Sequence, residues 1–166
     1  MTRAVQPLAK HHDRQGFDCG QSDLNDFLRL YALQQQTRLQ NKTYVACGEG
    51  GRIAGFYCLS IGSLGFTDLP AEIQKRLGRY PVPAVLIGRF AVDVQSQGQG
   101  LGRYLLAHAL HNVCNVAGIA GAVLAMVDAK DGKAAEFYQQ MGFRPLPDSP
   151  LRMFIPVAEL MKTIPA

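Results

Sequence analysis

Hydrophobic residues recur every three to four positions in two long stretches of the chain, which predicts two amphipathic helices. The first covers residues 21–38. Its predicted apolar face consists of Leu24, Phe27, Leu28, Tyr31 and Ala32. We expect Ser22 or Asp23 to cap its N-terminus, because short polar side chains accept hydrogen bonds from the free N–H groups of a first turn.

The second amphipathic helix covers residues 101–118 and is expected to end at Gly118. Its predicted buried side consists of Leu105, Leu106, Ala109, Leu110 and Val113. Two further helices are predicted over residues 68–78, with Pro70 in the first turn, and over residues 131–143, where Gly142 ends the helix.

Other stretches of the chain have the apolar patterns of β-strands. A hairpin is predicted over residues 42–63 with its turn at 48–51, and its second arm is apolar on both faces, as in a strand of a covered sheet. Single strands are predicted over residues 5–9, 84–94, 121–127 and 151–156.

The order of these elements indicates a mixed sheet, because a hairpin is antiparallel and strand–helix–strand units favour parallel pairing. We therefore expect an α/β (α+β) fold with six or seven mostly antiparallel strands and about four helices. The chain has 166 residues and shows neither repeats nor a linker, so residues 1–166 are expected to form one domain.

The composition is that of a globular protein, with 48% hydrophobic and 18% charged residues. No apolar run approaches the roughly 20 residues that cross a bilayer. The N-terminal stretch lacks the apolar core of a signal peptide, so a cytoplasmic protein without a membrane partner is expected. The spacing of Cys19, Cys47, Cys58 and Cys114 matches no zinc site, and we predict no metal; Cys47 and Cys58 are expected in the core.

The net charge of +4 permits an anionic ligand or a nucleic acid without requiring one. Basic residues concentrate between positions 75 and 103, where they outnumber a single acidic residue, Asp93. They are Lys75, Arg76, Arg79, Arg89 and Arg103. On charge alone, this segment is either a solvated face or an anion-binding face.

A glycine-rich run, "QGQGLGR" (97–103), links the strand over 84–94 to the following helix. Such a loop directs backbone N–H groups at one point near the positive end of the helix dipole, where phosphate binds. The spacing fits neither the dinucleotide fingerprint nor the P-loop. The alternative is a tight turn whose glycines serve only packing.

The arrangement Gln97-x-x-Gly100-x-Gly102 resembles the Q/R-x-x-G-x-G/A motif of the GNAT N-acetyltransferases, which use acetyl-CoA. The flanking stretches "RFAVD" (89–93) and "AAEFYQQMGF" (134–143) resemble the strand before that motif and a later signature of the same superfamily.

This resemblance implies a cofactor site. The backbone that would hold the CoA pyrophosphate belongs to Gln97, Gly98, Gln99, Gly100, Leu101, Gly102 and Arg103. The sheet would splay here, and the backbone of Phe90, Ala91 and Val92 would pair with the pantetheine arm. Asp131 stands where many relatives carry an Asn that binds this arm; alternatively, it caps the helix that follows.

Tyr138 matches the tyrosine that serves as general acid in much of the superfamily; the alternative is a tyrosine of the core. The strand over 84–94 carries no carboxylate before Asp93. A missing general base favours an α-amine acceptor, because its pKa of about 8 leaves part of it neutral. His108 and His111 are expected on a partly exposed helix face rather than in a metal pair.

The opening "FDCGQSDLNDFLRLYALQQQ" (17–36) resembles the start of one GNAT branch, which contains the TacT-like toxins of bacterial toxin–antitoxin pairs. This implies an acceptor, the α-amino group of aminoacyl-tRNA, and a ribbon-helix-helix antitoxin as partner. Relatives are often dimers, so a homodimer is expected. The side chains expected to contact tRNA are Lys75, Arg76, Arg79 and Arg89.

Two alternatives remain open from the sequence. One is a GNAT enzyme that acetylates a small amine or a protein N-terminus. The other is a non-catalytic acetyl-CoA-binding sensor.

Overall fold

A computed structural model of the protein describes residues 4–163. Its strands are β1 (Val5–Pro7), β2 (Lys42–Cys47), β3 (Ile53–Leu64), β4 (Val82–Val92), β5 (Leu124–Asp128), β6 (Arg144–Leu146) and β7 (Ser149–Pro156). Its α-helices are α1 (Ser22–Asp26), α2 (Ala32–Thr37), α3 (Ala71–Gln74), α4 (Leu101–Ala120), α5 (Gly132–Gln140) and α6 (Val157–Thr163). A π-helical segment, Phe27–Tyr31, joins α1 to α2. Short 3-10 turns cover Glu49–Gly51, Phe66–Asp68 and Val94–Ser96.

The strands form one seven-stranded sheet in the order β1-β2-β3-β4-β5-β7-β6. The pairs β1/β2, β2/β3, β5/β7 and β6/β7 are antiparallel, whereas β4 and β5 are parallel. The mixed, mostly antiparallel sheet predicted from the sequence is confirmed. β6 has no strand signal of its own because it is only three residues long and contains Pro145.

The chain forms two compact units. The first contains the chain up to Ser60 together with Gly88–Ala109, and the second contains Ile61–Ile87 and the chain from Leu110 onward. Each point at which the chain crosses from one unit to the other lies within a continuous helix or strand, namely β3, β4 or α4. The assignment of residues 1–166 to a single domain stays a prediction.

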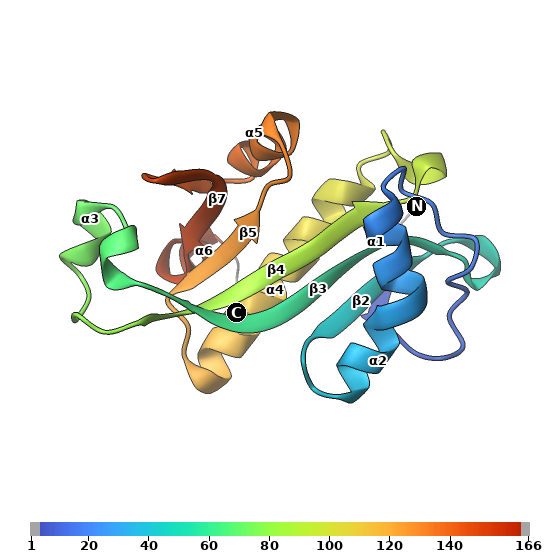
Figure 1. Ribbon diagram of the computed structural model, residues 1–166, viewed down its shortest axis with the longest axis horizontal. Helices are drawn as coiled ribbons and strands as arrows, with labels where there is room; N and C mark the ends of the chain where they lie inside the picture. The colour runs from blue at the N-terminus through green and yellow to red at the C-terminus, as the bar shows by residue number, and fades with distance from the viewer. Residues whose placement is uncertain (1–3, 164–166) are drawn as a thin grey trace. The chain divides into compact units, whose positions relative to one another are not determined.

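In the first unit, α1 and α2 run alongside β2 and β3 (Figure 1) and share one apolar core with them. Phe27 and Phe17 both contact Phe56 of β3, with ring centroids 6.1 and 5.4 Å apart. The hairpin turn is as predicted, because Gly50 and Gly51 both adopt a positive φ.

The first predicted helix forms over residues 22–37, but its middle is π-helical rather than α-helical. The N–H of Ala32 donates to the carbonyl of Phe27, five residues back, so the π-helical segment adds one residue to a turn. The apolar face therefore rotates, and Tyr31, predicted as buried, is 50% exposed. The predicted cap is also wrong: Gln21 is the N-cap, and its side chain makes no capping hydrogen bond.

α4 has the buried side that its sequence predicts, but it runs beyond Gly118. All five predicted core residues are at most 5% exposed. The helix ends at Ala120, because the left-handed conformation that stops it belongs to Gly121, with φ +83°, rather than to Gly118.

The helix predicted over 68–78 is much shorter in the structure. α3 spans only Ala71–Gln74, after the N-cap Pro70. Beyond it, Arg76 and Leu77 donate their N–H groups three residues back, to Ile73 and Gln74, which is a tighter turn than an α-helix makes.

The four cysteines are free thiols; Cys58 is buried, as predicted, whereas Cys47 is only half-buried. Among residues 4–163, there is no group of three or more potential metal ligands. No helix in this range is long and apolar enough to cross a membrane.

Candidate functional site

The glycine-rich loop follows the end of β4 and leads directly into α4. After Val92 the chain makes the 3-10 turn Val94–Ser96, and α4 begins at Leu101. Gly98 and Gly100 adopt positive φ values of 76° and 82°. These values lie in the left-handed region, which explains why glycine occupies both positions.

The loop surface is open at both of these glycines. A Cβ atom added to Gly98 or Gly100 would meet no atom within 4 Å. Residues from Gln97 to Gly100 are exposed, and the first-turn N–H groups of a helix lack intrahelical acceptors. The loop therefore fits an anion that approaches its backbone closely, as a pyrophosphate would.

Side chains hold this loop to the end of β4. The Gln97 amide donates to the carbonyl of Val92 at 3.0 Å, and the Gln99 amide donates to the carbonyl of Gln95 at 3.2 Å. Gln97 thus fixes the loop through its side chain, a role separate from the backbone contact that the sequence predicts. The Val92 carbonyl, expected to face the pantetheine arm, already accepts one hydrogen bond.

The end of β4 contains a backbone irregularity just before the residues expected to pair with the pantetheine arm. Arg89 has a φ of +47°, which is uncommon outside glycine. Its guanidinium lies 4.3 Å from the ring centroid of Phe27, in cation–π geometry. After it, Phe90 is half-buried, and Ala91 packs into the core of the first unit.

Tyr138 belongs to α5 in the second unit and is only 7% exposed. Its ring meets those of Phe137 and Phe143 edge-on, at centroid distances of 5.4 and 5.8 Å. Burial, together with the negative charge of Asp128, raises the pKa of Tyr138 to about 12. The phenol therefore stays protonated throughout the neutral range and can donate a hydrogen bond.

Asp131 caps α5, as one of the two interpretations predicted. Its carboxylate accepts the N–H of Ala134 at 2.8 Å. The contact of Asp131 with a pantetheine arm stays a prediction.

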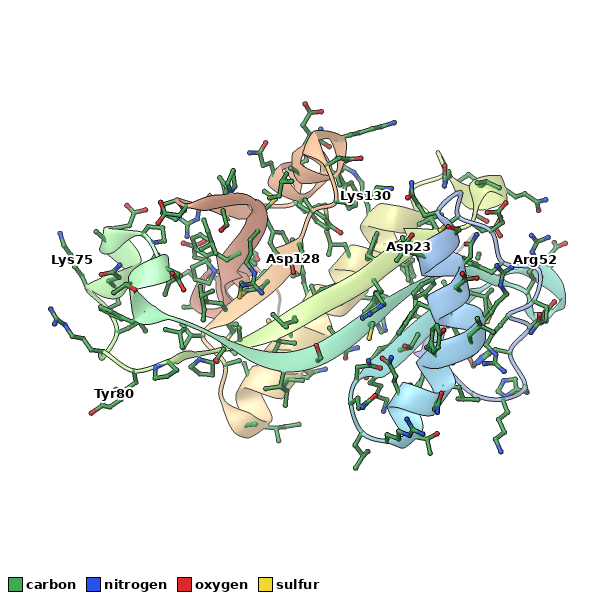
Figure 2. All side chains as sticks on the ribbon, in the orientation of Figure 1. Asp23, Arg52, Lys75, Tyr80, Asp128 and Lys130 are labelled. Atoms are coloured by element: carbon green, nitrogen blue, oxygen red, sulfur yellow. The ribbon has the colours of Figure 1, made fainter. Side chains whose placement is uncertain are left out.

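Three of the predicted tRNA-binding residues lie together in the second unit, at the end of α3 and just after it. Lys75, Arg76 and Arg79 are exposed, and none forms an ion pair with another residue in the range 4–163. Figure 2 shows the Lys75 side chain pointing away from α3, which ends just before it. Arg89 belongs to the first unit, where it stacks on Phe27.

Asp93, which lies just before the loop in the sequence, is engaged in structural contacts. It is 2% exposed and accepts the N–H groups of Asp18 and Gln95 at 3.0 and 2.9 Å. Arg52 forms an ion pair with it at 3.3 Å. Asp93 is thus part of a structural network, and a site without a general base stays a prediction.

The two histidines of α4 lie on a partly exposed face, as predicted. His111 is exposed and His108 is half-buried. The contact between His108 Nδ1 and the hydroxyl of Tyr57, at 2.7 Å, was not predicted from the sequence. A signal for it existed, because a tyrosine in a strand buried on both faces needs a partner for its hydroxyl.

Comparison with known proteins agrees with this architecture. The acetyltransferase (GNAT) domain family matches residues 40–145. A tRNA-acetylating toxin of Mycobacterium tuberculosis is 34% identical over 152 residues, which cover 92% of this chain and 90% of that protein.

Solved structures give the same result. The structure of AtaT complexed with acetyl-methionyl-tRNAfMet has a TM-score of 0.91 and 29% identity, covering 98% of this chain and 99% of that one. A tyrosine-to-phenylalanine variant of AtaT, bound to the C-terminus of the antitoxin AtaR and to acetyl-CoA, has a TM-score of 0.83 and 28% identity, covering 99% of both chains. The chain therefore belongs to the GNAT acetyltransferase family and, within it, to the group that includes the tRNA-acetylating toxins.

Proposed function

We propose that this protein transfers an acetyl group from acetyl-CoA to the α-amino group of aminoacyl-tRNA and thereby blocks translation. The observation that carries the proposal is the loop after β4, where Gly98 and Gly100 expose backbone in a conformation suited to a pyrophosphate. The similarity of nearly the whole chain to tRNA-acetylating toxins supports the choice of acceptor.

Acetyl-CoA, when bound, supplies an acetyl thioester. The amides of the loop from Gln97 to Arg103 bind its pyrophosphate, and Gln97 keeps the loop in place through its bond to the Val92 carbonyl. The backbone of Phe90, Ala91 and Val92 orients the pantetheine arm, and Asp131 contributes to binding the same arm.

With acetyl-CoA bound, Tyr138 would donate its phenolic proton to the sulfur as the C–S bond breaks and the new C–N bond forms. The proton that the acceptor nitrogen releases would return through water to the Tyr138 oxygen, so that the thiol and the phenol are both neutral at the end. At a pKa of about 12 the phenol is a weaker acid than a thiol, whose pKa is about 8.5, so full transfer in water would be unfavourable. The hydrogen bond to the developing negative charge is therefore the main contribution of Tyr138, and the proton moves late.

The acceptor amine does not need a dedicated base. Asp93 is occupied by Arg52 and by backbone N–H groups, so it does not take up the proton of the amine. An α-amino group is already partly neutral at neutral pH, unlike the side chain of lysine. Lys75, Arg76, Arg79 and Arg89 bind the phosphates of the tRNA.

The same proposal assigns partners and a location. AtaT has been solved with its antitoxin AtaR, and we expect a ribbon-helix-helix antitoxin to neutralise this chain. We also expect a homodimer that acts in the cytoplasm, where charged tRNA is used.

The decisive experiment incubates the protein with charged tRNA and labelled acetyl-CoA and identifies the acetylated aminoacyl adduct. Labelled N-acetyl-aminoacyl-tRNA is expected with the wild type and not with Tyr138→Phe. Label on free amines or on protein N-termini, with none on tRNA, would show that the acceptor is one of these and not aminoacyl-tRNA. Binding of acetyl-CoA without any transfer would indicate a sensor instead.

A further inference from the structure

The segment between Gly16 and Asn25 lies against the chain that leads into the cofactor loop. The N–H of Asp18 donates to Oδ2 of Asp93 at 3.0 Å, and the N–H of Val94 donates back to the carbonyl of Asp18 at 2.8 Å. These two hydrogen bonds join Asp18 to residues 75 and 76 positions further along the chain. They fix the point where the chain leaves β4.

Asp18 and Asn25 hold this segment in its bent shape. Oδ1 of Asp18 accepts the N–H of Gly20 at 2.9 Å and Nδ2 of Asn25 at 3.0 Å. Oδ1 of Asn25 accepts the N–H of Cys19 at 2.9 Å. Asn25 is only 7% exposed, so its amide has no solvent to replace these partners.

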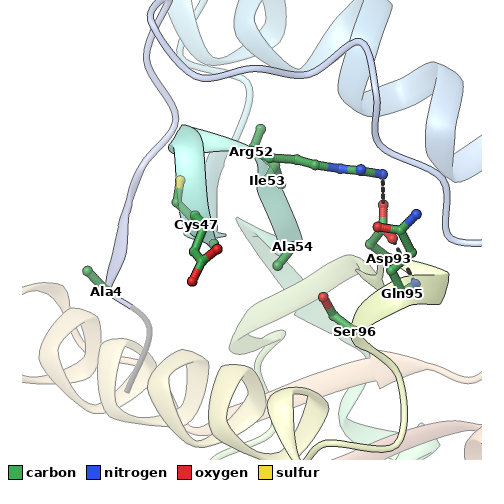
Figure 3. A pocket seen from close by; sticks show the side chains of 10 residues that line it. Ala4, Cys47, Arg52, Ile53, Ala54, Asp93, Gln95 and Ser96 are labelled. Atoms are coloured by element: carbon green, nitrogen blue, oxygen red, sulfur yellow. Dashed lines mark hydrogen bonds and ion pairs between the residues drawn. The ribbon is translucent and has the colours of Figure 1, made fainter. Parts of the chain in front are cut away.

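Asp93 carries the contact onward to the loop. Its Oδ1 accepts the N–H of Gln95, and its backbone carbonyl accepts the N–H of Ser96 at 2.9 Å. On the other side, Arg52 reaches Asp93 across one end of a pocket of about 490 Å³ (Figure 3) and also donates to the carbonyl of Gly16 at 2.8 Å.

A second contact reaches the loop itself. The Gln97 amide that holds Val92 also lies 3.5 Å from the carbonyl of Cys19. Cys19 therefore takes part through its backbone, since its N–H binds Asn25 and its carbonyl faces Gln97. Gly20, with φ +86°, places its Cα close to Val94, where an added Cβ would lie 3.8 Å from Cγ1.

We infer that Asp18 and Asn25 are positioning residues of the cofactor loop, which set the affinity for acetyl-CoA through Asp93 and Gln97 without touching the ligand. This inference rests on the proposed function of the loop. The "FDCG" stretch (17–20), which takes no part in the transfer reaction itself, would then serve to hold the cofactor loop in place.

The test uses the full-length Asn25→Asp variant and measures acetyl-CoA affinity by calorimetry. The substitution keeps the side-chain volume and the acceptor for Cys19 N–H, but it places an oxygen against Oδ1 of Asp18. We expect about tenfold weaker binding near neutral pH, with kcat at saturating acetyl-CoA nearly unchanged. At about pH 5 the defect should shrink, because two adjacent carboxyl groups can share one proton.

Two controls belong to the test. Asp26→Asn changes the next residue of the same helix, whose exposed carboxylate pairs with Arg29 at 3.5 Å, and should leave affinity unchanged. Asp23→Asn changes another exposed acidic residue of α1 and should also leave affinity unchanged. Both results would support a role for Asn25 that depends on its amide.

Wild-type affinity in folded Asn25→Asp would overturn the inference, and so would a loss confined to kcat. If that variant melts below the assay temperature, Asn25→Ser is judged by the same criteria. A wild-type protein that does not bind acetyl-CoA would instead overturn the proposed function of the loop.

Discussion

The two parts of the protein to which we assign chemistry are built in opposite ways. The cofactor loop offers exposed backbone, held in place by the side chain of Gln97 within it and by the side chain of Asp93 just before it. Tyr138 offers a side chain, which is buried and packs edge-on against the rings of Phe137 and Phe143. A substitution in the loop should therefore act through backbone shape, whereas one at Tyr138 should act through a single proton.

The largest expected effect comes from removing that proton. Tyr138→Phe keeps the ring contacts with Phe137 and Phe143 and should lower kcat by about 100- to 10,000-fold, the usual contribution of a general acid. Acetyl-CoA affinity should stay at the wild-type value. Steady-state kinetics with charged tRNA and calorimetry measure the two quantities; weaker acetyl-CoA binding with unchanged kcat would contradict the assignment.

The next effect tests the backbone of the loop. Gly100→Val should weaken acetyl-CoA binding by about 100-fold, because a branched side chain is strained at positive φ and covers the amides. Gly50→Val is the matched control, since Gly50 also has a positive φ and open surroundings but lies in the hairpin turn. Equal affinity losses in the two variants would show that strain, rather than the loop, is responsible.

A third, smaller effect separates tRNA binding from cofactor binding. Replacing Lys75, Arg76 and Arg79 together by Ala should weaken tRNA binding about tenfold and flatten its salt dependence by about two charges. Binding measured over a series of salt concentrations checks this, with the exposed Lys162→Ala as a control of unchanged slope. An unaltered slope in the triple variant would place the tRNA elsewhere.

The smallest effect concerns the surroundings of Tyr138. Because its folded-state pKa is raised above the ordinary value of 10, the stability it contributes is complete below about pH 10 and is lost between there and about pH 12. Asp128→Asn should lower the pKa of Tyr138 by less than one unit, since burial is the larger cause and Asp128 is itself 72% exposed.

Ultraviolet titration of the phenol, with Tyr138→Phe as the blank, measures this shift. High salt should reduce the difference between the wild type and Asp128→Asn. A shift of several units would mean that charge, rather than burial, keeps the phenol protonated.

The sequence predicted what depends on local pattern. α4 has an uninterrupted helical period, and its buried face was identified residue by residue, whereas the hairpin was found from its apolar strands and its turn at 48–51. The glycine loop could be predicted because a positive φ favours glycine, here Gly98 and Gly100. The cap at Asp131 could also be predicted, since its acceptor and donor lie three residues apart in the sequence.

What the sequence did not predict depends on contacts between distant segments. The hydrogen bond between Asp18 and Asp93 joins positions 75 residues apart, and no periodic pattern in the sequence predicts it. The pKa of Tyr138 depends on burial and on Asp128, which belongs to a different element.

The π-helical segment was not predicted for a different, local reason: its extra residue changes the helical period for a single turn only.

That π-helical segment has a consequence for how chain length varies within the family. Phe27–Tyr31 accommodates one residue more than a regular turn, while Phe27, its first residue, and Ala32, directly after it, are both buried. Losing one residue here would restore an ordinary α-helix and keep both anchors in the core. We expect one-residue deletions and insertions among homologues to gather at this turn, where evolution can change the length of the chain without repacking its interior.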